Sequence, residues 1–318
     1  MPVKVLVTHD MDKADLDKIR SVSDSVEVET ARNMAEALDK APGAEVIRPG
    51  RWSDELWKAA AGLKWVQSGG AGVERFLTAD FIASPIVLTN ARGIYAVPIA
   101  DHVIAFVLHF SRVFNMLLRK QIGHAWADWG ECEPDELVGK TLGIVGLGGI
   151  GTEVAKRAKA FDMRVIATRR RPKLPSDHAD EVRGADELPW LLRESDYVAL
   201  CAALTPGTRH LIGEEQLKLM KPTAHLINIG RGGLIDEQAL IAALKEQHIA
   251  GAGLDVFEME PLPADSPLWD MPNVLITPHT AGSSPRSHAR LMDLFCENLR
   301  RHVAGKPLLN VVDKAEGY

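Results

Sequence analysis

The stretch Leu142-Gly143-Ile144-Val145-Gly146-Leu147-Gly148-Gly149-Ile150-Gly151 decides the fold of this chain. It is an apolar run that ends in G-x-G-x-x-G, and Thr152-Glu153-Val154-Ala155-Lys156-Arg157-Ala158 then begins a helical pattern. In such a strand–turn–helix unit, the pyrophosphate of a dinucleotide lies on the N-terminus of the helix. Gly146 permits the tight turn, Gly148 lets the backbone approach the phosphates, and Gly151 lets helix and strand pack closely. The predicted contacts also include Gly149 and Ile150, and a glycine-rich turn without a ligand is the alternative.

The composition is typical of a globular protein. At 318 residues the chain exceeds the size at which a single core stops growing, so two domains are expected. A net charge of −6 argues against non-specific nucleic-acid binding, which needs a basic surface. The three cysteines are widely spaced, and they predict neither a disulfide framework nor a C-x-x-C site. Since no segment resembles a signal peptide or a membrane span, we expect a cytoplasmic protein without membrane contact.

From Leu142 onward, short apolar runs alternate with helical patterns, which predicts βαβ units and a parallel sheet covered on both faces. The predicted strands are Thr141–Gly146, Arg164–Thr168, Tyr197–Ala202, His225–Gly230, Gly253–Val256 and Val274–Pro278. The predicted helices are Gly151–Phe161, Asp186–Arg193, Glu214–Met220 and Asp236–Gln247, the last with Asp236 as its N-cap.

The first hundred residues repeat this alternation without a G-x-G-x-x-G motif. The predicted strands are Lys4–Thr8, Val26–Glu29, Glu45–Arg48, Lys64–Gln67 and Ile86–Thr89, with helices at Asp12–Arg20 and Asn33–Lys40 between them. A long, mostly apolar helix is predicted over Val97–Lys120, and a second long helix over Arg286–His302.

These patterns predict an α/β protein with two Rossmann/flavodoxin-like, doubly wound parallel-sheet domains and an interdomain cleft. The first domain is expected to be discontinuous, made of Met1–Asp101 and Gly282–Tyr318, and to bind the substrate. Residues 102–281 are expected to form a dinucleotide-binding Rossmann domain inserted between these parts. The two long helices would then be the crossovers between the domains.

Three polar residues follow the ends of predicted strands. Arg231 comes after His225–Gly230, Glu260 lies in the loop after Gly253–Val256, and His279 comes directly after Val274–Pro278. Because parallel strands end at the same edge of a sheet, these residues are expected to share that edge with the glycine-rich turn. Each residue alone also has an ordinary explanation as a solvated or structural side chain. Their shared placement favours a catalytic site.

This set of side chains suits hydride transfer to a 2-keto acid. Reduction at C2 creates an alkoxide that needs a proton, and histidine is the side chain that titrates near neutrality. Glu260, within hydrogen-bond reach of His279, would orient the ring and favour its protonated form. Arg231 offers a planar fork that can hold a carboxylate and polarise the adjacent carbonyl. The cofactor would supply the hydride.

In these residues the sequence resembles the D-2-hydroxyacid dehydrogenase family. The matching segments are Gly146–Gly151, Leu204–Arg209, Asn228–Asp236, Gly253–Leu262 and Thr277–Gly282. The resemblance implies that Arg231 binds substrate, that His279 is the acid/base and that Glu260 supports it. The similar formate dehydrogenases carry Gln at the position of Glu260, so the Glu–His pair favours keto-acid reduction.

The resemblance also implies contacts beyond these three residues. Ser68-Gly69-Gly70-Ala71-Gly72-Val73 looks like the family's substrate-carboxylate loop, in which backbone N–H groups of Gly70 and Ala71 would meet the anion, with Gly72 beside them. A plain glycine-rich turn is the alternative. Further cofactor contacts are expected at Ala202, Ile229, Gly230, Arg231, Asp255, His279 and Ala281.

The tip of the second strand of the nucleotide domain predicts the cofactor. NAD-preferring sites usually carry an acidic residue there, which accepts from the ribose 2′-hydroxyl. Here the strand ends in Thr168-Arg169-Arg170-Arg171, and Thr168, Arg169 and Arg170 could instead hydrogen-bond a 2′-phosphate. We therefore expect NADP(H) to be preferred, with NAD(H) possible, and a solvated basic turn is the alternative.

The predicted function is that of an NADPH-preferring reductase of small 2-keto acids, of the glyoxylate/hydroxypyruvate reductase type, which forms the D-2-hydroxy acid. The alternatives are a 3-phosphoglycerate or phosphite dehydrogenase, or a non-catalytic, NAD(P)-sensing scaffold that resembles the family's corepressors. No metal is expected, since the histidines lack ligand spacing. By resemblance the helix Val97–Leu118 would form a homodimer interface, although a buried interdomain helix explains the same pattern.

Overall fold

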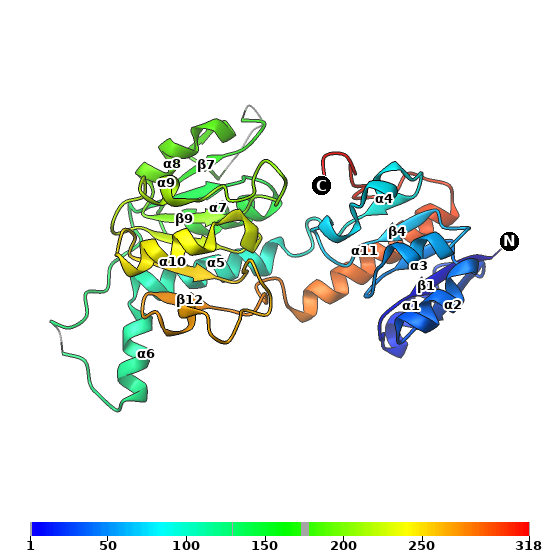
Figure 1. The fold of residues 1–318 in the computed structure, drawn as a ribbon, viewed down its shortest axis with the longest axis horizontal. Coiled ribbons are helices and arrows are strands. Elements are labelled where there is room, and N and C mark those ends of the chain that lie inside the picture. Colours follow the sequence, from blue (N-terminus) through cyan, green and yellow to red (C-terminus); the bar gives the residue numbers. More distant parts are fainter. Residues whose placement is uncertain (1, 129, 173–177, 318) are drawn as a thin grey trace. The chain divides into compact units, whose positions relative to one another are not determined.

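The computed structural model describes residues 2–128, 130–172 and 178–317. It divides into two compact units (Figure 1). Unit 1 comprises Met1–Tyr95 and Ser284–Tyr318, and unit 2 comprises Ala96–Ser283. Unit 1 is therefore built from both ends of the chain, and the α11 helix (Pro285–Val303) brings the chain back into it.

Unit 1 contains a five-stranded parallel sheet in the order β2-β1-β3-β4-β5. Its strands are β1 (Val3–Val7), β2 (Val26–Thr30), β3 (Val46–Arg48), β4 (Trp65–Gln67) and β5 (Val87–Thr89). The helices besides α11 are α1 (Lys13–Arg20), α2 (Met34–Lys40), α3 (Asp54–Ala59), α4 (Ala79–Ala83) and the 3-10 turns η1 (Ala41–Gly43) and η2 (Glu74–Phe76). All five predicted strands are confirmed to within two residues, whereas α3 and α4 were not predicted.

The start of each longer helix in unit 1 is encoded locally. Asp12, Asn33 and Ser284 precede α1, α2 and α11, and each side chain accepts a hydrogen bond from a backbone N–H in the first turn. The sheet is buried on both faces, with Val5, Val7 and Phe295 in one apolar cluster and Leu6, Ile47 and other side chains in the other. This core fixes the strand ends.

Unit 2 contains a seven-stranded parallel sheet in the order β12-β11-β10-β9-β6-β7-β8. Its strands are β6 (Thr141–Val145), β7 (Arg164–Thr168), β8 (Glu181–Arg183), β9 (Tyr197–Leu200), β10 (His225–Asn228), β11 (Gly251–Leu254) and β12 (Val274–Ile276). The helices are α5 (Ala96–Ser111), α6 (Phe114–Ile122), α7 (Gly149–Lys159), α8 (Leu188–Glu194), α9 (Glu214–Leu217), α10 (Glu237–Lys245) and the 3-10 turns η3 (Ala185–Glu187), η4 (Gly232–Leu234) and η5 (Pro267–Asp270). The strand β8 was not predicted.

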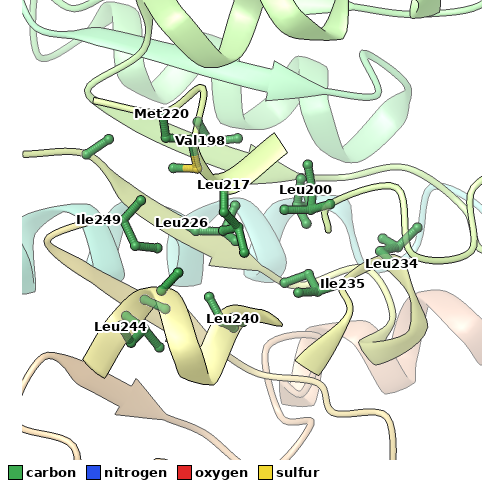
Figure 2. Packing of buried hydrophobic residues seen from close by; sticks show 14 of the residues in the cluster. Val198, Leu200, Leu217, Met220, Leu226, Leu234, Ile235, Leu240, Leu244 and Ile249 are labelled. Carbon is green, nitrogen blue, oxygen red and sulfur yellow. The ribbon is translucent and has the colours of Figure 1, made fainter. Parts of the chain in front are cut away.

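The core of unit 2 joins its sheet to the covering helices. Figure 2 shows Leu226 of β10 with Leu240 and Leu244 of α10 in one apolar cluster. Asp236 caps α10 as predicted, because its side chain accepts from Ala239 N at 3.1 Å. β11 begins two residues before the predicted Gly253. A Cβ on Gly253 would lie 2.8 Å from the ring of Phe106, so α5 requires small residues in this strand.

The predicted single helix over Val97–Lys120 is wrong. It is divided into α5 and α6, which meet at 71°, and Val113 between them has a φ of 49°, in the left-handed region. Most of α5 is buried, whereas α6 has no buried residue and stands apart from the sheet of its unit (Figure 1). Within the described residues, no single helix is long and apolar enough to cross a membrane, and only this bent pair passes by length and composition.

The predicted α/β class with two doubly wound parallel sheets is confirmed. The strand order of unit 1 is flavodoxin-like, and the direction in which successive strands are added to the sheet reverses between β1 and β3. Unit 2 has the Rossmann order with a seventh strand, β12, and its order reverses between β6 and β9. Ligands of such sheets bind beyond the carboxyl ends of the strands at these switch points.

Candidate active site

The glycine-rich turn lies at the switch point of unit 2. Gly146 follows β6 with a φ of 99°, and a Cβ there would lie 2.8 Å from the backbone N of Ala202, which follows β9. A Cβ on Gly151 would lie 2.5 Å from the carbonyl O of Gly146. Both positions therefore require glycine, because the turn, the helix α7 and the neighbouring strand are in direct contact.

Packing does not explain the other two glycines of the turn. A Cβ on Gly148 or Gly149 would have no atom of the described residues within 4 Å. Gly148 is the N-cap of α7, and it supplies no side chain to cap the first turn of this 11-residue helix. The first N–H groups of α7 are thus open on a side without Cβ atoms. This arrangement fits the pyrophosphate of a dinucleotide.

The loop after β10 is shaped by a buried asparagine. Asn228 Oδ1 accepts from Gly230 N at 3.1 Å, and Asn228 Nδ2 donates to the carbonyl O of Arg231 at 2.9 Å. A Cβ on Gly232 would lie only 1.8 Å from the carbonyl carbon of Phe257, so this loop lies directly on the loop after β11. Arg231 is half-buried, and its Nη1 donates to the carbonyl O of Gly230 at 2.7 Å.

A buried carboxylate fixes the loop after β12. Asp255 Oδ1 accepts from Thr277 Oγ1 at 2.6 Å and from Thr280 N at 2.9 Å, and Oδ2 accepts from Ala281 N at 3.0 Å. The carbonyl O of Asp255 accepts from His279 N at 2.8 Å, and His279 has a φ of 53°. These bonds span both sides of His279 and hold its backbone in the left-handed region.

His279 and Glu260 form the pair that their sequence positions predict. His279 Nδ1 lies 2.7 Å from Glu260 Oε2, and Glu260 Oε1 accepts from Phe257 N at 3.1 Å. The carboxylate is thus held by its own loop and fixes the orientation of the ring. His279 Nε2 has no partner within the described ranges, and half of the side chain is exposed. The ring is arranged to exchange a proton at Nε2.

The basic tip of β7 borders the glycine-rich turn, since the carbonyl O of Thr168 accepts from Gly146 N at 3.0 Å and from Leu147 N at 3.2 Å. The side chain of Thr168 is buried, whereas Arg169 is half-buried and Arg170 is exposed. Arg169 N donates to the carbonyl O of Arg183 in β8 at 3.1 Å, which holds the start of the basic segment against the sheet. The arginine side chains are therefore the accessible groups at this tip.

The loop after β4 belongs to unit 1. The carbonyl groups of Gly69, Gly70 and Ala71 accept from Tyr95 Oη, Ala91 N and Asn90 Nδ2. Gly70 N donates to Ser68 Oγ at 3.2 Å, so an N–H group predicted to meet the substrate is already hydrogen-bonded within the loop. The N–H groups of Ala71 and Gly72 have no partner in the described part of the chain, so these two amides can bind an anion.

Two residues that hold these strand ends were not predicted to do so. Asp255 was assigned to the cofactor, and the structure shows its carboxylate bonded to the loop of His279. His102 of α5 was not among the predicted site residues, although its Nε2 lies 3.0 Å from Thr277 Oγ1 in the same network. An aspartate directly after a buried strand of small residues was the available signal. Across the described residues, no group of three or more potential metal ligands is present.

Comparison with known proteins gives a consistent result. A family model described as D-isomer specific 2-hydroxyacid dehydrogenase, NAD binding domain, matches residues 104–281. The D-3-phosphoglycerate dehydrogenase of Methanocaldococcus jannaschii is 36% identical over 316 residues, which are 98% of this chain and 59% of that protein. The glyoxylate reductase of Korarchaeum cryptofilum is 37% identical over 266 residues, which are 82% of this chain and 79% of that protein.

A solved structure extends the similarity to the whole chain. The NADPH-dependent glyoxylate/hydroxypyruvate reductase of Sinorhizobium meliloti, in complex with NADP and sulfate, is 28% identical. The match has a TM-score of 0.87 and covers 99% of this chain and 100% of that one. By contrast, the chain spans only 59% of the length of the phosphoglycerate dehydrogenase.

Proposed function

Since the chain belongs to the D-isomer specific 2-hydroxyacid dehydrogenase family of NAD(P)-dependent oxidoreductases, we propose that it reduces small 2-keto acids to D-2-hydroxy acids. The observation that carries this proposal is the 2.7 Å contact between His279 Nδ1 and Glu260 Oε2. A proton donor held at the carboxyl edge of a dinucleotide-binding sheet suits the reduction of a carbonyl to an alcohol.

When bound, NAD(P)H would supply the hydride that C2 of the keto acid needs. His279 Nε2 gives its proton to the oxygen that becomes the hydroxyl, while Glu260 holds Nδ1 and stabilises the charged ring. The guanidinium of Arg231 binds the substrate carboxylate and polarises the carbonyl beside it. Asp255 acts through the backbone of His279 as a positioning residue.

The experiment that tests this function is an oxidation assay of NADPH with glyoxylate, hydroxypyruvate, pyruvate and phenylpyruvate. Turnover of at least one of these acids with formation of the D-product is the expected result. Binding of NADPH without turnover of any acid would contradict the proposal and favour a cofactor-sensing scaffold. A variant with His279→Ala controls for contaminating activity.

We propose that NADPH is the preferred cofactor. The tip of β7 carries Arg169 and Arg170 and no carboxylate, and a guanidinium can pair with the 2′-phosphate that distinguishes NADPH from NADH. The similar reductase from Sinorhizobium meliloti is described as NADPH-dependent, which supports the proposal. Arg170→Ala should raise the KM for NADPH several-fold and leave the KM for NADH nearly unchanged. A lower KM for NADH than for NADPH in the unaltered protein would overturn it.

We also propose that the active form is a homodimer formed through α6. Phe114, Leu118 and Ile122 recur every four residues on this helix and are each about half or more exposed, and Trp126 follows with 94% of its surface exposed. Such a stripe on a helix that stands apart from its own sheet suits a second copy of the chain. Light scattering of the Leu118→Glu variant should report a monomer if α6 forms the interface. Trp129, three residues further along the chain, lies outside the described residues.

The substrates named for the two relatives differ chemically at C3. Glyoxylate has a single carboxylate and no C3, whereas 3-phosphoglycerate carries a second anionic group there. The catalytic pair of unit 2 serves either substrate class, so the choice between them depends on other residues.

A further inference from the structure

The loop after β11 carries Glu260, and two consecutive backbone amides of this loop are each bound by a carboxylate. Phe257 N donates to Glu260 Oε1 at 3.1 Å, and Glu258 N donates to Glu237 Oε2 at 3.2 Å. The first carboxylate belongs to the loop itself, whereas the second comes from the first turn of α10. The loop is therefore anchored from outside at the residue next to the amide that holds Glu260.

Glu237 faces the interior of unit 2 rather than a ligand. Its side chain is half-buried, and it lines a cavity of about 10 Å³ together with Asn228, Leu254 and other side chains. A space of this size is at the limit for a single water molecule. Burial raises the pKa of the Glu237 carboxyl, and the hydrogen bond from Glu258 N partly opposes this effect. The position is thus unfavourable for a carboxylate except for its contact with the loop.

A histidine contacts the side chain of the same loop residue. His210 Nε2 lies 2.7 Å from Glu258 Oε1. His210 belongs to the loop after β9, and its backbone N donates to the carbonyl O of Gly233 at 2.8 Å. The loop after β9 therefore contacts the loops after β10 and β11. Glu258 is held at its amide by Glu237 and at its side chain by His210.

The loop after β10, which carries Arg231, lies directly against this anchor. A Cβ on Gly232 would lie 1.8 Å from the carbonyl carbon of Phe257 and 2.3 Å from Glu258 N. Since no space separates the two loops at this point, a shift of Glu258 would act on both. The anchor thus fixes the loops of two proposed catalytic residues, Arg231 and Glu260.

We propose that Glu237 is a positioning residue for the reaction. It holds Glu258 N in place, and the loop fixed in this way keeps Glu260 on the ring of His279. His210 supports the same loop through the side chain of Glu258. The proposal rests on the proposed reduction of 2-keto acids, because Glu237 acts only through the proton donor and its partner.

The first test removes the acceptor at position 237 and then restores it. Glu237→Ala should lower kcat by about 3- to 10-fold, the scale of one hydrogen bond, and leave the KM for NADPH unchanged. Glu237→Gln keeps an acceptor oxygen and should retain most of the kcat. Glu246→Ala is the matched control, since Glu246 is exposed at the other end of α10 and also lies near a histidine, at 3.5 Å.

The pair of variants separates this role from a structural one. A negative charge in the first turn also stabilises a helix. If Glu237 served only α10, its charge would matter, and the Ala and Gln variants would lose the same amount of kcat. That result would overturn the proposal, and so would an unchanged kcat in Glu237→Ala.

A double-mutant cycle tests whether the effect passes through Glu260. In the Glu260→Ala background, adding Glu237→Ala should lower kcat by less than about twofold. The full additional loss would show that Glu237 acts by another route and would contradict the proposal. His210→Ala, at a more exposed position, should lower kcat by about two- to threefold. It carries the test if Glu237→Ala does not fold, and an unchanged kcat would then count against the anchor.

Amide hydrogen exchange, followed by NMR, separates this proposal from the reductase function. In Glu237→Ala the amides of Glu258 and Phe257 should both exchange faster than in the unaltered protein, whereas the amides of β11 should not change. If no acid is reduced but both amides respond, the proposed function fails and the anchor stands. Faster exchange at Glu258 alone would overturn the proposal, because the bond between Phe257 N and Glu260 would then not depend on Glu237.

Discussion

The two sheets of this protein differ at their carboxyl edges in how the buried polar groups are paired. In unit 2 the polar groups are paired, since the side chain of Asp255 accepts three hydrogen bonds and Glu260 contacts both Phe257 N and His279. In unit 1 Arg48 is buried without a counterion and His9 Nδ1 has no partner in the described part of the chain. Paired polar groups fix the geometry of their edge, whereas buried polar groups without a partner favour the binding of a ligand.

The largest effect on activity is expected from removing the proposed proton donor of unit 2. His279→Ala should lower kcat by about 10² to 10⁴-fold, because it removes the proposed proton donor. The change should be measured by steady-state kinetics with the best keto acid. His248→Ala, at an exposed position outside this network, serves as the control. Turnover by the His279 variant at the unaltered rate would reject its assigned role.

A second test concerns the residue that fixes this edge. Asp255→Asn would place an amide where Ala281 N or Thr280 N needs an acceptor, and a buried unsatisfied donor costs about 1–3 kcal/mol of unfolding free energy. We expect this loss in urea denaturation, together with a lower kcat. The exposed Asp265→Asn is the matched control. A raised KM for NADPH with normal kcat and stability would instead assign Asp255 to cofactor binding.

How much of each edge could be predicted depends on how local its cause is. The glycine-rich turn, the Asp236 cap and the positions of Glu260 and His279 follow from short segments whose pattern specifies strand, turn and helix. The break after Ser111 could not be predicted, because no Gly or Pro marks it and both helices are rich in apolar residues. β11 began earlier than predicted because Gly251 and Gly253 are required by packing against other segments.

The burial of Arg48 in unit 1 could not be predicted from the sequence for a related reason. An arginine at the end of a strand is usually solvated, and only the packing of Phe295, His9 and Gly50 around Arg48 shows that this one is buried. The hydrogen bonds of Asp255 are likewise a tertiary feature, since its partners come from a strand end more than twenty residues away. The sequence therefore predicts which strand ends carry polar residues, whereas only the structure shows whether these residues are buried and paired.

Acid provides a smaller test that acts on both units. Burial lowers the pKa values of His9 and His225 to about 4, and His225 is stacked between Phe110 and Tyr197. Between about pH 6.5 and pH 4 the unfolded chain binds more protons, so stability falls as the pH falls through this window. At pH 5 His225 should have cost roughly 2 kcal/mol relative to pH 7, and the less deeply buried His9 should have cost less.

Substitution separates the two contributions to this acid sensitivity. His225→Phe keeps a stacked ring but removes the titration, so urea denaturation should show a smaller loss of stability between pH 7 and pH 5. Adding phosphate should reduce the remaining loss, because an anion beside His9 favours its charged form. An identical loss in both proteins would show that His225 does not contribute.

The smallest expected effect is a change in Tm, and it tests the difference between the two sheet edges most directly. Replacing a buried, unpaired cation with an apolar side chain of similar length removes its desolvation cost, whereas the same kind of change at a paired group leaves its partner unsatisfied. Arg48→Met should therefore raise Tm by a few degrees without ligand, since 1 kcal/mol corresponds to roughly 2–4 °C in a protein of this size class. With saturating phosphate or sulfate the order should reverse, because only the unaltered protein gains from the anion. Thermal unfolding with and without anion measures both differences. If Arg48→Met were less stable than the unaltered protein under both conditions, Arg48 would be a structural residue, and the contrast between the two edges would fail.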